Sequence, residues 1–349
     1  MIDLPGTSAP SLQPMKITIL GAGAWGTALA VALAPRHSVL LWGRNAAAMR
    51  DAATRHENQP SLPGIALPGT LSLSADLDDA IAHCNSAATG DALLIVAASV
   101  AGLRPIAQQL AVRQVPNLIW LCKGFEESSG FLPHQIVSQE LGAALPCGAL
   151  SGPSFALEVA RGQPTALTVA STDPQLRDLV VRAVHGQRLR VYKTDDVTGV
   201  EVGGAVKNIM AIATGIVDGL GLGNNARAAL ITRGLAEISR FGIALGGRAE
   251  TFMGLAGIGD LMLTCTGDLS RNRQVGLALA GGKKLDAIVS QLGHVAEGVR
   301  CARAVRARAA ALQVEMPISA AVAGVLFDDV PLDEIVTRLL SRDARNESV

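Results

Sequence analysis

The chain of 349 residues lacks several features that would point to common classes of protein. Its formal net charge is zero, so no bulk attraction draws it to nucleic acid or to an anionic membrane. Its five cysteines contain no C-x-x-C pair, which favours reduced thiols over a disulfide framework. Its six histidines show no pair at metal-ligand spacing. We therefore expect neither nucleic acid as a partner nor a metal as a cofactor.

Long apolar runs and an N-terminal targeting signal are also missing. No apolar run approaches the ~18–20 residues that a membrane span needs. Residues 1–14 have neither a positively charged start nor an apolar stretch, so we interpret them as a flexible extension rather than a secretory signal. These observations predict a cytoplasmic protein without a membrane span. Hydrophobic residues make up 49% of the chain and charged ones 17%, which is typical of a well-packed globular protein long enough for two domains.

A glycine-rich turn follows the first apolar run. Lys16–Leu20 leads directly into Gly21-Ala-Gly-Ala-Trp-Gly26, and helical spacing then begins. A strand, a G-x-G-x-x-G turn and a helix in this order are typical of a dinucleotide-binding unit. Gly21 would permit the tight turn, Gly23 would let the backbone approach a pyrophosphate, and Gly26 would let the helix pack closely on the strand. Trp25, at the start of the helix, would pack on the cofactor or between two domains.

The end of the second predicted strand bears on the choice of cofactor. Ser38–Trp42 is followed by Gly43 and Arg44, where a fold that favours NAD would carry an acid for the ribose 2′-hydroxyl. An arginine there can accept a 2′-phosphate, so we predict that NADPH is used well. The alternative is that Arg44 only stacks on the adenine or faces solvent.

Further apolar runs predict a doubly wound sheet. They are continuous rather than alternating, which is typical of central strands in a parallel sheet covered on both faces. They occupy residues 92–97, 118–122, 148–150, 166–170 and 190–192. Lys123 and the segment 151–156 each follow such a run directly, and ligands collect beyond the carboxyl ends of strands in this class of fold. Either segment could equally be an ordinary surface turn.

Strand patterns end before residue 199, and helical patterns replace them. The predicted helices occupy residues 226–245, 271–280, 285–292, 296–312 and 331–340. The fold class that we expect is therefore α/β, with an N-terminal Rossmann-type dinucleotide-binding domain at 15–203 and a C-terminal all-helical substrate-binding domain at 204–345.

One lysine lies among apolar residues, where a charged side chain is unusual. The chain has six lysines against 24 arginines, and Lys207 is the only one between Thr194 and Gly282. Apolar neighbours at helical spacing, such as Val206 and Ile209, leave little polar surface beside it. Loss of water lowers the pKa of a lysine, which suits a proton donor near neutral pH. The alternative is an amphipathic helix whose lysine keeps its ammonium in water.

A second glycine-rich stretch, 254–260, ends in Asp260 and is followed by Ser270, Arg271 and Asn272. Ser270 is a plausible N-cap, which places the next two residues in a first helical turn where backbone N–H groups favour an anion. Because an arginine adds bidentate hydrogen bonds, this segment could bind a phosphate monoester. The alternative is a capped helix with an ordinary surface ion pair.

Eight segments in order resemble the bacterial NAD(P)-dependent glycerol-3-phosphate dehydrogenases over nearly the whole chain after residue 14. They are GAGAWGTALA, LWGR, CKGFE, SGPSFA, GGAVKNIMAIATGIVDGLGLGNNARAALITRGLAE, GLAGIGDLMLTCTG, SRNR and VAEG. The resemblance implies reversible reduction of dihydroxyacetone phosphate to sn-glycerol 3-phosphate with NADPH or NADH. That product is the backbone precursor of membrane phospholipids. A homodimer is usual in the family.

The resemblance also assigns roles to single residues, with Lys207 as the catalytic acid/base and a substrate contact. The other substrate-binding residues that it implies are Lys123, Gly152, Ser154, Asp260, Ser270, Arg271 and Asn272. The cofactor-binding residues that it implies are Ala24, Trp25, Arg44, Lys123, Ala156, Arg271, Val295 and Glu297, beside Gly21, Gly23 and Gly26 of the turn. Asn208 and Thr264 are similar to site residues of the wider family. Serine is frequent in the family where Ala24 stands.

Two other functions are compatible with parts of the pattern. A two-domain NADP-dependent reductase of β-hydroxyacids or keto acids would share the architecture, but its carboxylate substrates do not need the phosphate site at 270–272. A non-catalytic NADPH-binding sensor would keep the glycine turn but has no reason to retain Lys207 together with Asp260 and Arg271.

Overall fold

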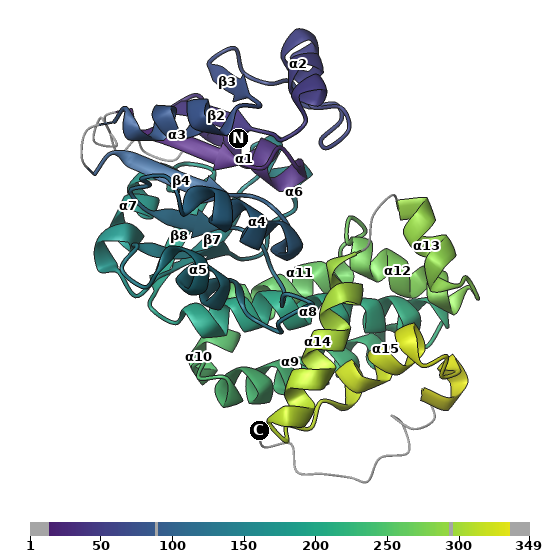
Figure 1. Ribbon diagram of the computed structural model, residues 1–349. Coiled ribbons are helices and arrows are strands. Elements are labelled where there is room, and N and C mark those ends of the chain that lie inside the picture. Colours follow the sequence, from purple (N-terminus) through teal and green to yellow (C-terminus); the bar gives the residue numbers. More distant parts are fainter. Residues whose placement is uncertain (1–13, 88–89, 293–295, 336–349) are drawn as a thin grey trace, which may run out of the picture.

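The computed structural model describes residues 14–87, 90–292 and 296–335. A sheet flanked by helices forms one half, drawn from purple to teal in Figure 1, and a bundle of helices in green and yellow forms the other. Both parts of the expected fold class are therefore confirmed. The extension at 1–14, except Pro14, and Val295 lie outside the described residues, as does the predicted helix 331–340 beyond residue 335.

The sheet has eight strands in the order β3-β2-β1-β4-β5-β6-β7-β8. Their bounds are β1 Lys16–Leu20, β2 Ser38–Trp42, β3 Leu71–Ser74, β4 Ala92–Val96, β5 Leu118–Trp120, β6 Cys147–Ser151, β7 Thr165–Ala170 and β8 Leu189–Thr194. Leu20 pairs with Trp42 on one side and Val96 on the other, so β1, β2 and β4 end level with one another. The strand order reverses between β1 and β4, and such switch points hold ligands in open α/β sheets.

Seven helices connect the strands of the first half. They are α1 Ala24–Leu33, α2 Ala46–Arg55, α3 Leu77–Asn85, α4 Val100–Leu110, α5 Pro133–Leu141, α6 Ala156–Ala160 and α7 Pro174–Val184. Two buried apolar clusters pack these helices on the two faces of the sheet. Strands buried on both faces explain the continuous apolar runs of the sequence.

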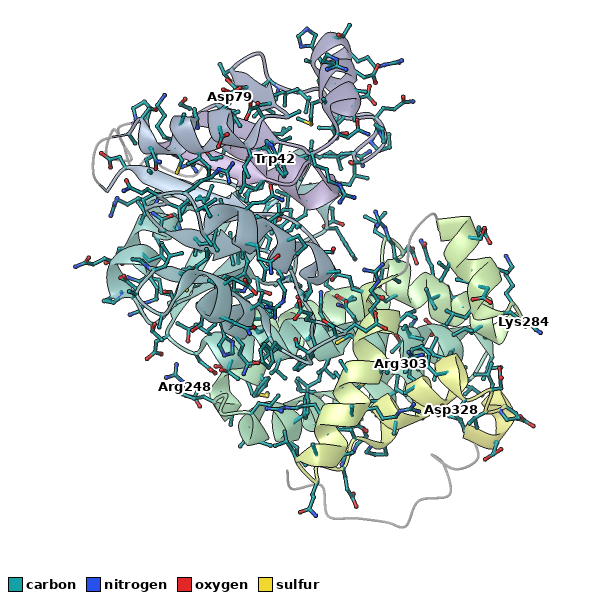
Figure 2. All side chains as sticks on the ribbon, viewed as in Figure 1. Trp42, Asp79, Arg248, Lys284, Arg303 and Asp328 are labelled. Carbon is teal, nitrogen blue, oxygen red and sulfur yellow. The ribbon has the colours of Figure 1, made fainter. Side chains whose placement is uncertain are left out.

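The second half is built from helices alone among the described residues. They are α8 Val197–Gly219, α9 Gly223–Ala244, α10 Ala249–Phe252, the π-helix η1 Leu255–Gly259, α11 Asp260–Thr266, α12 Arg271–Ala280, α13 Leu285–Leu292, α14 Glu297–Ala311 and α15 Pro317–Phe327. Arg303 of α14, labelled in Figure 2, lies over the ring of Phe327 of α15, 4.4 Å from its centre. This contact joins two of the helices that pack against α8.

Helix α8 runs through the middle of the molecule and carries Lys207. All residues from Gly199 to Val217 are buried, because helices α9, α11, α12 and α14 surround it on the helical side and β6 contacts it on the sheet side. The expected division at 203/204 falls inside this helix. By length and composition alone α8 is long and apolar enough to span a membrane, although its sequence contains no uninterrupted apolar run of that length. Its most apolar stretch is entirely buried inside the protein, as in the core helix of many folds.

Several local features were not predicted from the sequence. The sheet is not wholly parallel, because β6 and β7 pair antiparallel; their connection holds only the five-residue α6, and the chain returns in the opposite direction. The edge strand β3 was missed, since its sequence LSLS is short and only half-buried. Helix α15 was also missed, although Pro317 at its first turn and its apolar sequence are compatible with a buried helix. The short segments α10, η1 and α11 were likewise missed.

Candidate active site

The carboxyl ends of four parallel strands bring predicted site residues to one edge of the sheet. Gly21 follows β1, Arg44 follows β2, Lys123 follows β5 and Gly152 follows β6. Because β2, β1, β4, β5 and β6 are neighbours in that order and pair in parallel, these residues lie along a single rim. The rim includes the switch point between β1 and β4, where a ligand is expected.

The glycine turn leaves an open approach to the first turn of α1. Gly21 has φ +130°, and a Cβ on it would lie 2.5 Å from the carbonyl oxygen of Ala97, so no other residue fits. A Cβ on Gly26 would lie 2.0 Å from the carbonyl oxygen of Gly21, whereas one on Gly23 would meet nothing within 4 Å. Helix α1 begins without a side-chain cap. Its free N–H groups and the open side of Gly23 fit the pyrophosphate of a dinucleotide.

The other residues predicted to bind the cofactor surround this turn. Three of them, Ala24, Trp25 and Ala156, are partly buried and pack against the same apolar cluster, where α1 contacts α6. Arg44 is exposed just beyond β2, and Gly21 donates its N–H to Trp42 at the end of that strand. Two further contacts were not predicted from the sequence: Asn58 and Ser61, in the segment after α2, both donate to the carbonyl oxygen of Ala22.

Lys207 lies in the buried face of α8 and is 7% exposed. Its Nζ donates to Asp260 Oδ1 at 2.5 Å and to Thr264 Oγ1 at 2.9 Å. Burial lowers the pKa of Lys207 to about 8, against the opposing charge of Asp260 and with a smaller contribution from the charge of Lys123. The expected desolvation of this lysine is thus confirmed, and its ammonium is not in bulk water.

Asp260 joins two lysines from different halves of the molecule. Its Oδ1 accepts from Lys207 and its Oδ2 accepts from Lys123 at 2.7 Å. Burial alone would raise the pKa of Asp260, but the charges of Lys123 and Lys207 outweigh it and hold the pKa below its usual value. Lys123 also donates to the carbonyl oxygen of Gly152 at 3.1 Å, and the Ser154 hydroxyl donates to the same oxygen. Four predicted substrate residues therefore gather around Lys207.

The π-helix η1 sets the position of Asp260. Gly257 inside it has non-helical φ −98° and ψ −105°, and the chain then turns directly into α11, which begins at Asp260. The segment lies so close to α8 that a Cβ on Gly203 would be 2.4 Å from the carbonyl oxygen of Ala256. This contact, one turn before Lys207, brings the carboxylate against the lysine.

The start of α12 forms a second polar group beside α8. Ser270 is its N-cap and accepts from the N–H of Arg273 at 3.3 Å, as predicted. Arg271 is exposed in the first turn. Asn272 is buried; its amide donates to Asn208 Oδ1 at 3.0 Å and its oxygen accepts from the N–H of Gly298 at 3.0 Å. The segment thus links α12, α8 and the start of α14.

Glu297, at the start of α14, faces the same region. Burial raises its pKa, against the charges of Lys123, Lys207, Arg300 and Arg271. Its carboxylate therefore lies within electrostatic reach of the lysines at one end and of Arg271 at the other. No group of three or more histidine, cysteine, aspartate or glutamate side chains within the described ranges could hold a metal ion.

Comparisons with known proteins agree over both halves of the chain. The family model described as NAD-dependent glycerol-3-phosphate dehydrogenase N-terminus matches residues 16–177, and the corresponding C-terminus model matches residues 196–337. A curated glycerol-3-phosphate dehydrogenase (NAD(P)+) of Herminiimonas arsenicoxydans is 68% identical over 334 residues, covering 95% of this chain and 99% of its own.

Solved structures separate this family from others of similar architecture. The crystal structure of glycerol-3-phosphate dehydrogenase from Coxiella burnetii has a TM-score of 0.87 at 41% identity, covering 95% of this chain and 100% of that one. D-mandelate dehydrogenase with NADH has a TM-score of 0.55 at 13% identity, covering 90% and 98%, and shares the fold alone. By its sequence matches along both halves, the chain belongs to the NAD(P)-dependent glycerol-3-phosphate dehydrogenases, the family that its motifs resemble.

Proposed function

We propose that this chain reversibly reduces dihydroxyacetone phosphate to sn-glycerol 3-phosphate with NADPH or NADH, and so supplies the backbone of glycerophospholipids. The observation that carries this proposal is the buried Lys207, which shares Asp260 with Lys123 at the rim of a dinucleotide-binding sheet. A carbonyl that is being reduced needs a proton on its oxygen, and a lysine with a pKa of about 8 can donate one near neutral pH.

The hydrogen bonds of Lys207 leave one donor for the substrate. An ammonium has three N–H bonds. Among the described residues two of them are directed to Asp260 and Thr264. The third would donate to the carbonyl oxygen at C2 of dihydroxyacetone phosphate, stabilise the negative charge that develops there and transfer the proton. Lys207 would then regain a proton from solvent, and in the reverse reaction it would act as the base.

The remaining predicted residues would bind and orient the two ligands. Gly21, Gly23 and the start of α1 would hold the pyrophosphate, and Arg44 would hold the 2′-phosphate of NADPH. The bound nicotinamide would supply the hydride that reaches C2. Ser270, Arg271 and Asn272 would anchor the substrate phosphate at the start of α12. Binding energy at that remote phosphate would align the reacting carbon with Lys207.

Two broader proposals come from the resemblance. We propose a cytoplasmic location and a homodimer, which is usual in the family. Light scattering on the purified chain distinguishes a dimer from a monomer.

The direct test is oxidation of NADPH, followed optically, with dihydroxyacetone phosphate as the only added substrate. We expect rapid oxidation that disappears in the Lys207→Ala variant. Tight NADPH binding without oxidation would reject this substrate, and keto acids would be the next substrates to test. In that case the segment 270–272 would be an ordinary helix cap.

A further inference from the structure

Two polar side chains outside the predicted site hold one peptide of the glycine turn. Asn58 is 8% exposed, and its amide donates to the carbonyl oxygen of Ala22 at 2.9 Å. The Ser61 hydroxyl donates to the same oxygen at 3.0 Å. Asn58 also donates to the Thr27 hydroxyl, in the first turns of α1, at 2.8 Å. One amide therefore joins the turn to the helix that follows it.

We propose that Asn58 and Ser61, the Asn58–Ser61 clamp, are positioning residues that set the glycine turn for dinucleotide binding. The proposal rests on the proposed function, because it concerns the cofactor end of the same site. It is based on the geometry of a single peptide plane.

The peptide between Ala22 and Gly23 is trans, so its C=O and its N–H point in opposite directions. The clamp holds the C=O on the side of residues 58–61, and the N–H of Gly23 is thereby directed to the other side. A Cβ on Gly23 would meet nothing within 4 Å, so this glycine borders open space. Without the clamp the plane could rotate, because glycine residues on either side of Ala22 restrict the backbone little.

The clamp is itself firmly held. The carbonyl oxygen of Asn58 accepts from the N–H of Ser61 at 3.1 Å and from the N–H of Leu62 at 2.8 Å. Leu62 is 4% exposed and belongs to the apolar cluster beneath α1. Glu57 Oε1 accepts from the N–H of Gly64 at 2.8 Å. The clamp therefore links the buried core to the peptide between Ala22 and Gly23.

The clamp acts on a part of the cofactor that NADPH and NADH share. The hydrogen bonds of its two side chains go to Ala22 and Thr27, and neither Arg44 nor a side chain around Lys207 is among these partners. Its removal should therefore weaken both dinucleotides by the same factor, whereas a change at Arg44 should weaken NADPH alone. A residue that only stabilises the fold would, when removed, lower the free energy of unfolding but leave both dissociation constants of the folded chain unchanged.

The experiment measures dissociation constants of NADPH and of NADH by fluorescence titration of the full chain, without dihydroxyacetone phosphate. For Asn58→Ala we expect both constants to rise about tenfold, since two neutral hydrogen bonds are lost. At saturating NADPH, kcat and the KM for dihydroxyacetone phosphate should stay within about twofold, because the groups at Lys207 are unchanged. The matched control is Gln59→Ala, an exposed neighbour in the same segment, which should leave both constants unchanged.

Ser61→Ala removes a single donor and keeps the test decisive if Asn58→Ala folds poorly. We expect a rise of about threefold for both dinucleotides in this variant. Unchanged constants in the variants that fold would overturn the proposal, as would a loss confined to NADPH or a fall in kcat as large as the fall in affinity. Because the dissociation constants are measured without dihydroxyacetone phosphate, a wild-type chain that binds NADPH but does not oxidise it with dihydroxyacetone phosphate would reject the proposed function, and the constants of the variants would still test the clamp.

Discussion

The cofactor end and the substrate end of the candidate site present different chemical groups. At the cofactor end the groups that face the open rim are mainly backbone, namely Gly23 and the uncapped start of α1. At the substrate end they are charged side chains, with Asp260 between Lys123 and Lys207. Backbone groups recognise a part that many nucleotides share, whereas buried charges can change protonation state. The difference predicts that changes at the two ends should affect different kinetic constants.

Removal of Lys207 should have the largest effect. We expect Lys207→Ala to lower kcat by roughly 10²–10⁴-fold, the usual contribution of a positioned proton donor. The dissociation constant of NADPH should stay within about twofold, because the glycine turn is untouched. Steady-state kinetics and fluorescence titration measure the two quantities. Lys193→Ala, which removes an exposed lysine paired with Asp178, is the control. Near-normal turnover in Lys207→Ala would remove Lys207 as the proton donor.

Neutralising Asp260 should affect both activity and stability. In Asp260→Asn the two ammonium groups lose their shared carboxylate, and breaking such a buried pair costs about 3–5 kcal/mol of the free energy of unfolding. Urea denaturation measures this loss. We also expect the pKa of Lys207 to fall further in this variant, because in the wild-type chain the charge of Asp260 opposes the lowering by burial. An unchanged free energy of unfolding together with an unchanged pH profile would contradict the shared role of Asp260.

The pH dependence of the wild-type enzyme should reveal Lys207 directly. Burial lowers its pKa to about 8, so Lys207 is protonated below that pH and neutral above it. Reduction of dihydroxyacetone phosphate needs the protonated form, and kcat/KM should fall about tenfold per unit as pH rises above 8. Oxidation of sn-glycerol 3-phosphate needs the neutral form, so its kcat/KM should rise about tenfold per unit as pH approaches 8 from below and level off above it. Binding of NADPH should change little there. Parallel profiles in the two directions would argue against a single proton donor and acceptor.

A charge reversal at Arg44 should sharpen the comparison within the cofactor end itself. We expect Arg44→Asp to raise the KM for NADPH about tenfold, since a charge-assisted contact with the 2′-phosphate is lost. The KM for NADH should change much less, and kcat with either cofactor should be retained. Arg50→Asp, an exposed arginine on the adjacent helix α2, is the control. Equal losses for both cofactors would contradict recognition of the 2′-phosphate by Arg44.

The cofactor end of the site could be predicted from the sequence more completely than the substrate end. The glycine turn was readable because its geometry is local: each glycine is required within six consecutive residues. The contact of Asp260 with Lys207 and Lys123 could not be read from any local pattern, since these partners lie 53 and 137 residues away along the chain. The family resemblance named the three residues, but only the fold shows one carboxylate between two ammoniums. Asn58 was missed for the same reason, because its partners lie 36 and 31 residues away and no local pattern marks it.

Helix boundaries showed a similar limit. The N-cap at Ser270 was predicted because capping is local. Helix α15 was missed because an apolar helix buried on most sides has little periodicity, and β3 was missed because an edge strand needs few apolar residues. The antiparallel pairing of β6 and β7 depends on how the chain packs between the two strands, which no pattern within either strand records.

The burial of α8 has a consequence for how the protein is made. The sheet half emerges from the ribosome first, and α8 follows it as a long apolar helix before most of its neighbours exist. The helices α9, α11, α12 and α14 that cover it are all synthesised later. Nascent chains at this stage carry an exposed apolar surface, which is the kind of surface that chaperones bind. A chain truncated before residue 297 lacks α14, which packs against α8, so it should aggregate and have no activity.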